Sequence, residues 1–151
     1  MTRRSQSGFT LVELMIVVMI IGVLAGIAIP NMIALMDRAK EGSTRANMHK
    51  LQLTAEDYSV QNDGKYSLTA AAIVNIMPGG SGNFQNPFTG TTGLGVAWED
   101  RGDGNLANAP AAISGITSYA DSAQITYVIK GVGKATSGPR FPLPLMLSAG
   151  Q

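Results

Sequence analysis

The chain contains no cysteine among its 151 residues, and only one histidine and one tryptophan. The absence of cysteine excludes a disulfide framework, thiol catalysis and thiolate metal sites. The single histidine, His49, has no second imidazole with which to form a metal pair or a catalytic dyad, so we expect it at the surface or in helix packing. We predict that the chain is not an enzyme, with no catalytic residue and no cofactor.

Charge is also scarce and evenly spread, with a formal net charge of +1. A protein that binds nucleic acid through its backbone phosphates usually carries a clustered basic surface, which this balance does not provide. We therefore predict no nucleic-acid partner. The alternative is a DNA contact through Lys130, Lys134 and Arg140.

Ionisable residues are absent from one long apolar run, residues 14–36. About 20 apolar residues are enough to cross a bilayer as a helix, so we predict a membrane span. A secretory signal peptide is the competing interpretation, but its apolar region is only 7–15 residues long and ends in an A-x-A-like site. Arg3 and Arg4 precede the span and favour a cytoplasmic N-terminus, although Arg38, Lys40 and Arg45 weaken this preference.

The pattern beyond the span predicts that the same helix continues. Apolar or small residues recur at helical spacing, and charged residues lie opposite them, which favours one helix over residues 9–61. An Asn-Asp-Gly sequence at 62–64 is a strong stop signal. The expected buried positions are Thr44, Met48, Leu51, Ala55 and Tyr58, and the expected solvent-facing positions are Arg45, Lys50, Glu56 and Asp57.

The remaining residues, 62–151, predict a small head of mixed structure. Ser67 is placed to cap a short helix over residues 68–77, which Pro78 and the following glycines end. After a glycine-rich connection, strands are expected at residues 94–99, 124–130 and 143–148, with Ile125, Tyr127 and Ile129 on one face. The fold class is therefore α+β: a long N-terminal helix packed on a small antiparallel β-sheet.

Three glycine-bearing or acidic stretches superficially resemble ligand loops. Residues 131–136 lack the glycines of nucleotide-binding loops, and we interpret them as a hairpin turn. Residues 79–83 end in asparagine and fail the nucleophile-elbow pattern. Asp100, Asp103 and Asn105 offer oxygen ligands for calcium, but their spacing does not fit an EF-hand loop, so a solvated turn is the preferred interpretation. Trp98 beside them is expected in the core or in a subunit contact.

One motif in the sequence resembles a known family. Gly8-Phe9-Thr10-Leu11-Val12-Glu13 follows a short basic leader and precedes the apolar run that ends in Ala-Ile-Pro at residues 28–30. This arrangement is similar to the N-terminus of type IV pilins and of the pseudopilins of type II secretion. The residues 56–67 and 86–90 are loosely similar to later parts of such proteins.

The resemblance implies a processing pathway. A membrane-embedded prepilin peptidase would cut after Gly8 and methylate the new amine of Phe9. Residues 1–8 would be a cleaved leader, 9–36 the transmembrane and assembly helix, 37–61 its amphipathic continuation, and 62–151 the extracytoplasmic head. The resemblance also implies that the region from Gly22 to Pro30 loosens in filaments. Proline lacks the N–H for the helix hydrogen bond, and glycine adds flexibility and close approach.

A lone carboxylate, Glu13, lies just inside the apolar run and requires an explanation. An ionised group in hydrocarbon costs a few kcal/mol even on lenient scales. Glu13 either snorkels to the cytoplasmic interface or, as we prefer, meets the Phe9 amine of a neighbouring copy. Gly22, Gly26 and Pro30 likewise serve either ordinary helix packing or, as we prefer, assembly.

The predicted function is a structural subunit that polymerises through its N-terminal helix into a type IV pilus-like filament. The alternatives are a pseudopilin of a type II secretion system, a minor subunit that primes assembly, or a membrane-anchored binding or enzymatic domain. The expected partners are further copies of the chain, the prepilin peptidase and inner-membrane assembly machinery. The chain would be a single-pass protein of the bacterial inner membrane before it enters a pilus or a periplasmic pseudopilus.

Overall fold

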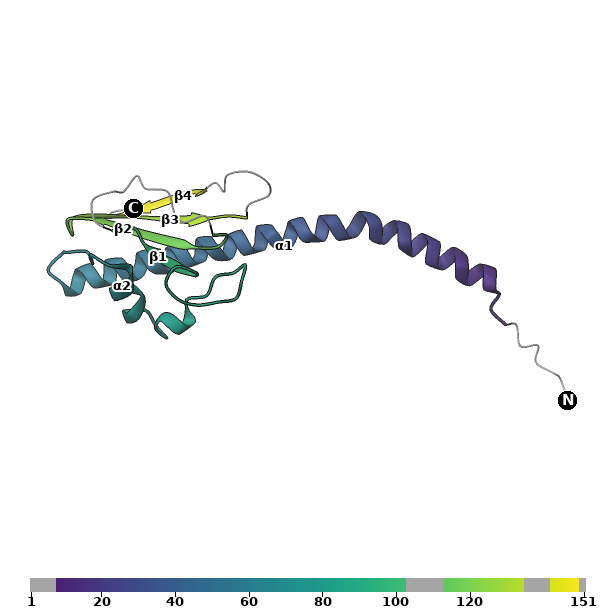
Figure 1. Cartoon of the computed structure of the whole chain (residues 1–151), viewed down its shortest axis with the longest axis horizontal. Helices are drawn as coiled ribbons and strands as arrows, with labels where there is room; N and C mark the ends of the chain where they lie inside the picture. The colour runs from purple at the N-terminus through teal and green to yellow at the C-terminus, as the bar shows by residue number, and fades with distance from the viewer. Residues whose placement is uncertain (1–7, 103–112, 135–141, 150–151) are drawn as a thin grey trace. The chain divides into compact units, whose positions relative to one another are not determined.

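The computed structural model describes residues 8–102, 113–134 and 142–149. Its first element is a single long helix, α1, which spans Leu11–Gln61 (Figure 1). The chain divides into two compact units, Met1–Met36 and Asp37–Gln151. The predicted long helix is therefore confirmed, with a start two residues later than expected.

The end of α1 follows the predicted stop signal. Asp63 and Gly64 both adopt positive φ angles, 54° and 78°. The Gly64 N–H donates to the Ser59 carbonyl at 2.8 Å, which satisfies one of the carbonyls left open at a helix C-terminus. The Asn62 side chain donates to the Tyr58 carbonyl at 2.8 Å. Local residue chemistry thus ends the helix at this point.

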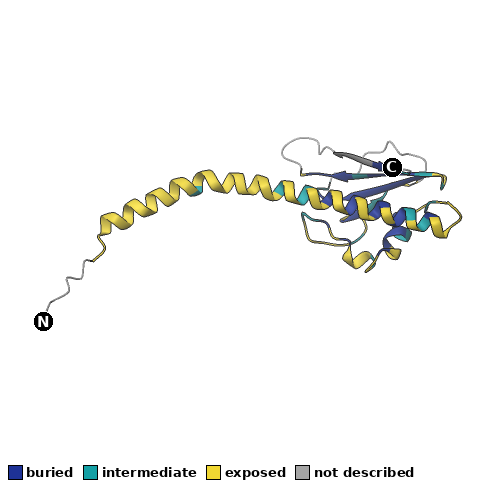
Figure 2. Cartoon of the chain, turned by 180° about the vertical axis from the view of Figure 1, so that it is seen from behind, coloured by how far each residue is buried: buried dark blue, intermediate teal, exposed yellow. Residues whose placement is uncertain are grey.

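One face of the second half of α1 is buried in the head (Figure 2). The first four residues of the predicted buried stripe are confirmed, whereas Tyr58 is only half-buried and Ser59 is buried in its place. Glu56 was expected to face solvent, but it is half-buried and accepts hydrogen bonds from two tyrosines. The buried residues of α1 are Thr44, Asn47, Met48, Leu51, Gln52, Thr54, Ala55 and Ser59.

The short helix α2 spans Ala70–Ile76. Its N-cap is Thr69, whose Oγ1 accepts from the Ala72 N–H at 3.4 Å. The prediction that Ser67 caps this helix is wrong: Ser67 instead accepts from the Thr69 N–H, which orders the approach to the cap. The helix ends before Pro78 as predicted, and a single 3₁₀ turn, η1, follows at Ser81–Asn83.

The four-stranded sheet has the order β1-β2-β3-β4. The strands are β1 (Trp98–Asp100), β2 (Thr117–Ser122), β3 (Thr126–Val132) and β4 (Pro142–Ser148). The pairs β2–β3 and β3–β4 are antiparallel, but β1 pairs with β2 in parallel. The predicted antiparallel sheet is therefore corrected to a mixed sheet, because β1 runs in the same direction as its neighbour β2.

The turn between β2 and β3 explains a second error. Ala123 and Gln124 both adopt positive φ angles, 52° and 61°, which β-strands do not contain. The strand therefore begins at Thr126, and Ile125 is 78% exposed instead of sharing the buried face of Tyr127 and Ile129.

The core of the head joins α1, α2 and the sheet. Trp98 is buried within it, which confirms the expectation of a core residue. In Figure 1 the strands run alongside the second half of α1. The buried cluster consists of Met48, Leu51, Ala55, Ala70, Ile73, Val74, Met77, Phe84, Ala97, Trp98, Tyr119, Tyr127, Ile129 and Leu147.

Candidate processing and assembly site

The start of α1 is built by a reciprocal pair of side chains. Oε2 of Glu13 accepts from the Thr10 N–H at 2.9 Å and from the Thr10 hydroxyl at 2.8 Å. The Glu13 N–H in turn donates to the Thr10 hydroxyl oxygen at 3.3 Å. This is a capping box, in which a threonine at the N-cap and a glutamate three residues later satisfy two open N–H groups. Glu13 therefore has a partner within its own chain.

The residues around the expected cleavage point lie outside the helix. Gly8 and Phe9 precede α1 and are exposed, and Phe9 is 78% exposed. A peptide bond that is not part of a helix needs no unwinding before it enters a protease. The described geometry is compatible with processing between these two residues, which stays a prediction.

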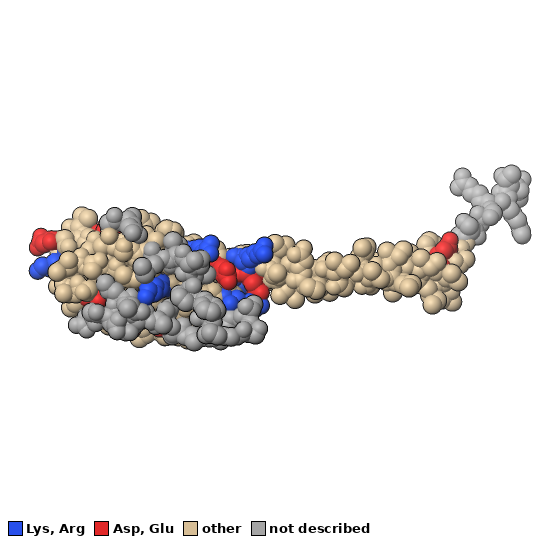
Figure 3. All heavy atoms as spheres, turned by 90° about the horizontal axis from the view of Figure 1, so that it is seen from above, with Lys and Arg blue, Asp and Glu red and all other residues tan. Residues whose placement is uncertain are grey.

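The apolar part of α1 has no partner in the described chain. None of its most apolar stretch is buried, and by length and composition it is able to cross a membrane. Figure 3 shows this stretch as a surface without blue or red atoms. Apolar surface of this extent indicates contact with lipid or with other protein chains. The span predicted for residues 14–36 is present as an exposed helix.

Gly22, Gly26 and Pro30 all lie within this exposed part of α1. A Cβ built on either glycine meets no atom within 4 Å, so neither glycine packs against a neighbour in its own chain. Pro30 stands inside the helix, where its missing N–H removes one backbone hydrogen bond. Their assembly roles remain predictions, and any close packing must involve another molecule.

A lysine and an aspartate pair at the beginning of the unit Asp37–Gln151. Lys134 at the end of β3 forms an ion pair with Asp37, and its backbone N–H donates to Oε1 of Glu41 at 3.2 Å. The ion pair connects the end of β3 to α1. It also engages one of the three cations considered for a DNA contact, while Lys130 is half-buried and Arg140 lies outside the described residues.

Two tyrosines, Tyr66 and Tyr127, hydrogen-bond to Glu56 on α1, and Tyr127 thereby connects α1 to β3. Glu56 accepts from the hydroxyl of Tyr127 at 2.6 Å and from that of Tyr66 at 3.0 Å. The Tyr127 ring stacks on Tyr119 with centroids 5.7 Å apart. Burial, followed by the hydrogen bond and negative charge of Glu56, raises the pKa of Tyr127 well above its usual range. The hydroxyls of Tyr66 and Tyr127 therefore stay protonated and donate hydrogen bonds to Glu56.

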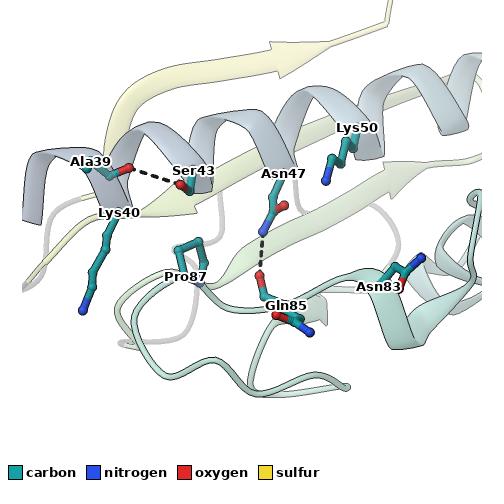
Figure 4. Close-up of a pocket in the computed structure, with 8 residues that line it drawn as sticks. All are labelled: Ala39, Lys40, Ser43, Asn47, Lys50, Asn83, Gln85 and Pro87. Atoms are coloured by element: carbon teal, nitrogen blue, oxygen red, sulfur yellow. Dashed lines mark hydrogen bonds between the residues drawn. The ribbon is translucent and has the colours of Figure 1, made fainter. Parts of the chain in front are cut away.

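A polar groove lies in the head between α1 and the segment after η1 (Figure 4). Asn47 crosses its floor and donates to the Gln85 carbonyl at 2.8 Å. Lys40 and Lys50 flank it, and no acid, cysteine or histidine lines it. The lining hydroxyl of Ser43 donates to the Ala39 carbonyl at 3.2 Å, and no lining carboxylate or imidazole accompanies it.

The candidate calcium loop is only partly described. Asp100 ends β1, and its two oxygens accept from the backbone N–H groups of Ala70 at 2.8 Å and Gly102 at 3.0 Å. Asp103 and Asn105 lie outside the described residues. Within the described ranges, no group of three or more His, Cys, Asp or Glu residues is placed to hold a metal. Asp100 acts there as an anchor between α2 and β1.

The structure also tests the predictions for His49 and for residues 131–136. His49 is exposed, with Nδ1 3.4 Å from the Gln52 side-chain oxygen, as expected for a surface residue. Gly131 and Val132 belong to β3 and not to a turn, so the predicted hairpin turn is corrected to a connection that begins after Val132. Residues 135–141 of that connection lie outside the described residues.

Comparison with known proteins identifies the N-terminal segment. Residues 3–29 match the family model of the prokaryotic N-terminal methylation motif. Over this segment the chain resembles the type IV pilins and the pseudopilins of type II secretion. The resemblance inferred from Gly8 to Glu13 is thereby confirmed.

Curated relatives of the chain include type IV pilus proteins and a type II secretion protein. The chain is 47% identical over 60 residues to the type IV major pilin protein PilA of Myxococcus xanthus, covering 40% of this chain and 27% of the relative. It is 33% identical over 85 residues to the type II secretion system core protein G of Pseudomonas aeruginosa, covering 56% of this chain and 59% of the relative.

A third relative is the type IV wide pilus major component PilA4 of Thermus thermophilus, with 36% identity over 73 residues. The alignment covers 48% of this chain and 55% of that protein. The matched parts thus span less than two thirds of each of these relatives. No solved structure matches the chain.

Sequence reasoning missed three residues that organise the molecule. Thr10 could have been found, because Thr-x-x-Glu before an apolar run is a capping-box signal. Lys134 lies 97 residues from Asp37 in the chain, and no local pattern reveals their pairing. Asn86 is fully buried and donates from Nδ2 to the carbonyls of Val96 and Ser114, both at 2.8 Å.

Proposed function

We propose that this chain is a structural subunit that is cut after Gly8 and polymerises through α1 into a type IV pilus-like filament. The observation that carries the proposal is the exposed apolar helix that follows the methylation motif. Its side chains are solvent-exposed in the single chain, and polymerisation or a bilayer would cover them. The described head needs no such partner, because it buries its own core.

Before assembly, the exposed helix holds the chain in the bacterial inner membrane, with Asp37–Gln151 on the extracytoplasmic side. Glu13 lies at the cytoplasmic end of this helix, next to the amine that cleavage would create at Phe9. In a filament both groups enter a low-dielectric interior, where an unpaired charge costs several kcal/mol. An ion pair between them therefore favours the assembled state.

The pseudopilus is the second candidate, and a specific observation supports it. The P. aeruginosa type II secretion core protein G is matched over a larger share of this chain than the M. xanthus PilA, 56% against 40%. Both candidates require the same cleavage and the same helix-mediated polymerisation. Shearing of the cells separates them, because surface filaments would be released from a pilus-forming cell, whereas a periplasmic pseudopilus would stay cell-associated.

The anchored enzyme or binding domain has less support. The groove of Figure 4 is lined by one hydroxyl, that of Ser43, and by no carboxylate or imidazole that could activate it. We expect the head to be inert towards small-molecule substrates.

Mass spectrometry of assembled material tests the processing step. The first residue should be Phe9 with one additional methyl group, and a bulky residue in place of Gly8 should leave the precursor in the membrane. Filaments composed of chains that still begin at Met1 would refute the cleavage.

A further inference from the structure

Three cations follow the apolar run closely, and the proposed filament gives them no role. Arg38, Lys40 and Arg45 all lie on α1 within nine residues of Met36. Cations beside a membrane span favour the cytoplasmic side, but the proposed topology puts these three on the extracytoplasmic side. Figure 3 shows blue and red atoms side by side at one end of the head. Their position therefore calls for a compensating interaction.

The acids of this region are engaged within the chain. Lys134 forms an ion pair with Asp37, and its backbone N–H donates to Oε1 of Glu41 at 3.2 Å. Lys40 is directed towards the ring of Phe88, with its Nζ 5.6 Å from the ring centroid, as in a cation–π contact. These charged groups therefore have partners in the head itself.

Arg38 and Arg45 differ from them. Both side chains are exposed, and neither forms a hydrogen bond or an ion pair with the residues that the structure describes. Seven residues are close to two helical turns, so the two arginines share one face of α1, about 10.5 Å apart along its axis. This face of the helix carries two cations without a counter-charge.

Gly42 lies between the two arginines on the same face. A Cβ built on Gly42 meets no atom within 4 Å, so the surface there is open. Side chains on a helix lean towards its N-terminus, and Arg45 consequently leans over the turn that contains Gly42, in the direction of Arg38. The planar fork of donors on each guanidinium matches the oxygens of a phosphate. The two arginines are therefore placed to approach one anionic group.

We propose that Arg38 and Arg45, with Gly42 between them, bind the headgroup of an anionic phospholipid in the extracytoplasmic leaflet of the membrane. The inference rests on the membrane stage of the proposed function. Arg38 is the second residue after the uncharged run, and the interfacial layer beyond the hydrocarbon is about 5–7 Å thick on each side. Arg38 thus meets the headgroups where α1 leaves the hydrocarbon, and Arg45 leans back towards them.

The competing occupant of this face is an acidic side chain of a second copy. The acids next to the arginines are less suited to that role, because Lys134 engages both Asp37 and Glu41 in the same chain. A lipid needs no such release, and its headgroup lies at the level of Arg38 in every inserted chain. The observations therefore favour the lipid, and the experiments below separate the two occupants.

The first test titrates lipid onto the full chain, residues 1–151, in detergent micelles and measures binding by native mass spectrometry. Each basic residue near an anionic lipid surface changes binding by about fivefold. The unaltered chain should therefore bind dioleoylphosphatidylglycerol about 25-fold more tightly than dioleoylphosphatidylcholine. Arg38→Gln or Arg45→Gln should reduce this ratio to about fivefold, and the double variant should bind the two lipids equally.

The matched control combines Lys50→Gln with Lys65→Gln. Both lysines are exposed, and their replacement removes the same charge from other parts of the head. The control should keep the lipid ratio within about twofold of that of the unaltered chain. Equal binding of the two lipids by the unaltered chain would overturn the inference. A control that loses as much preference as the arginine variant would overturn it too, because net charge alone would then be the cause.

The second test fills the open surface between the arginines. Leucine is a good helix former, so Gly42→Leu should preserve α1 while it occupies the place over which Arg45 leans. The lipid ratio should fall to about fivefold, as though one arginine were lost. Ser43→Leu is the control at an exposed position on another face of the helix, and it should leave the ratio within about twofold. An unchanged ratio in Gly42→Leu would contradict the proposed site.

Flotation with vesicles of dioleoylphosphatidylcholine separates this inference from the proposed function. The unaltered chain and the double arginine variant should both float, because the apolar part of α1 is sufficient as an anchor. Failure of the unaltered chain to float would refute the proposed membrane stage. Filament yield in cells is the last arm. If the double variant keeps the lipid ratio of the unaltered chain but loses filaments, the arginines bind a second copy and the inference is overturned.

Discussion

The two units of this chain solve the problem of apolar surface in opposite ways. In Met1–Met36 the described apolar side chains are almost all exposed, and in Asp37–Gln151 the largest ones are buried. Burial of apolar surface stabilises a fold by about 25 cal/mol per Å². The head obtains this stabilisation from its own residues, while the N-terminal segment must obtain it from lipid or from other copies. The contrast separates folding from assembly within one chain.

The largest effect is expected from cutting the chain between these regions. A truncated chain that begins at Ala34 should be soluble, monomeric and cooperatively folded, because the head core does not use residues before Thr44. The full chain should need detergent. Size-exclusion chromatography with light scattering checks both statements, and aggregation of the truncated chain would show that the head depends on the apolar helix.

Asn86→Ala should cause the largest single-residue loss within the head. Its side chain donates to two carbonyls and its Oδ1 accepts from the Phe88 N–H at 2.8 Å, so the substitution strands buried polar groups. We expect a loss of about 3 kcal/mol in the free energy of unfolding. Denaturant titration of the head measures it. Asn83→Ala, at an exposed position, should change stability by less than about 0.5 kcal/mol.

The tyrosine pair predicts a dependence of head stability on alkaline pH. Burial and Glu56 raise the pKa of Tyr127 in the folded head above the ordinary value of 10.0. Because the unfolded chain loses this proton first, the contribution is complete below about pH 10 and is lost as the pH rises above that value. Denaturation midpoints at pH 8 and pH 11 should differ less in Tyr127→Phe. An equal difference in both proteins would exclude Tyr127 as the cause.

Lys134→Ala should have the smallest effect. The lysine side chain is 37% exposed and the Asp37 side chain 22%, and such pairs contribute between zero and about 1 kcal/mol. We expect a loss of about 0.5 kcal/mol in the stability of the head, which salt should diminish. Denaturant titration at low and high salt tests this, with Lys65→Ala as the control for removal of an exposed lysine. A loss that is independent of salt would point to packing instead of charge.

Features of the fold with a local sequence signal were predictable, whereas several others were not. The apolar run and the Asn-Asp-Gly stop define α1, because both are local signals with a direct physical cause. Strand β2 was missed because Thr117–Ser122 is rich in small and polar residues. The parallel pairing of β1 depends on the path of a connection, and the left-handed Ala123 and Gln124 carry no glycine signal. Long-range partners decide these features.

In the candidate site, the contiguous motif was predicted from the sequence, but the hydrogen bonding of Glu13 was not. Gly8, Phe9 and Glu13 were found because the motif is contiguous, and the match over residues 3–29 confirms the motif. The sequence predicted that Glu13 either snorkels to the cytoplasmic interface or pairs with a neighbouring copy, whereas the structure shows hydrogen bonds to Thr10 within the chain. The Thr-x-x-Glu pattern that predicts these hydrogen bonds is present at residues 10–13.

The most direct measurement of the central claim is the filament yield of Glu13→Gln. Glutamine preserves the size of the side chain and its place in the capping box, so it removes little except the charge. We expect normal membrane insertion, normal cleavage after Gly8 and a normally folded head. Filament yield should fall at least about tenfold, because the Phe9 amine would enter a low-dielectric interior without a counter-charge. Filaments of ordinary number and length, counted by electron microscopy, would contradict it.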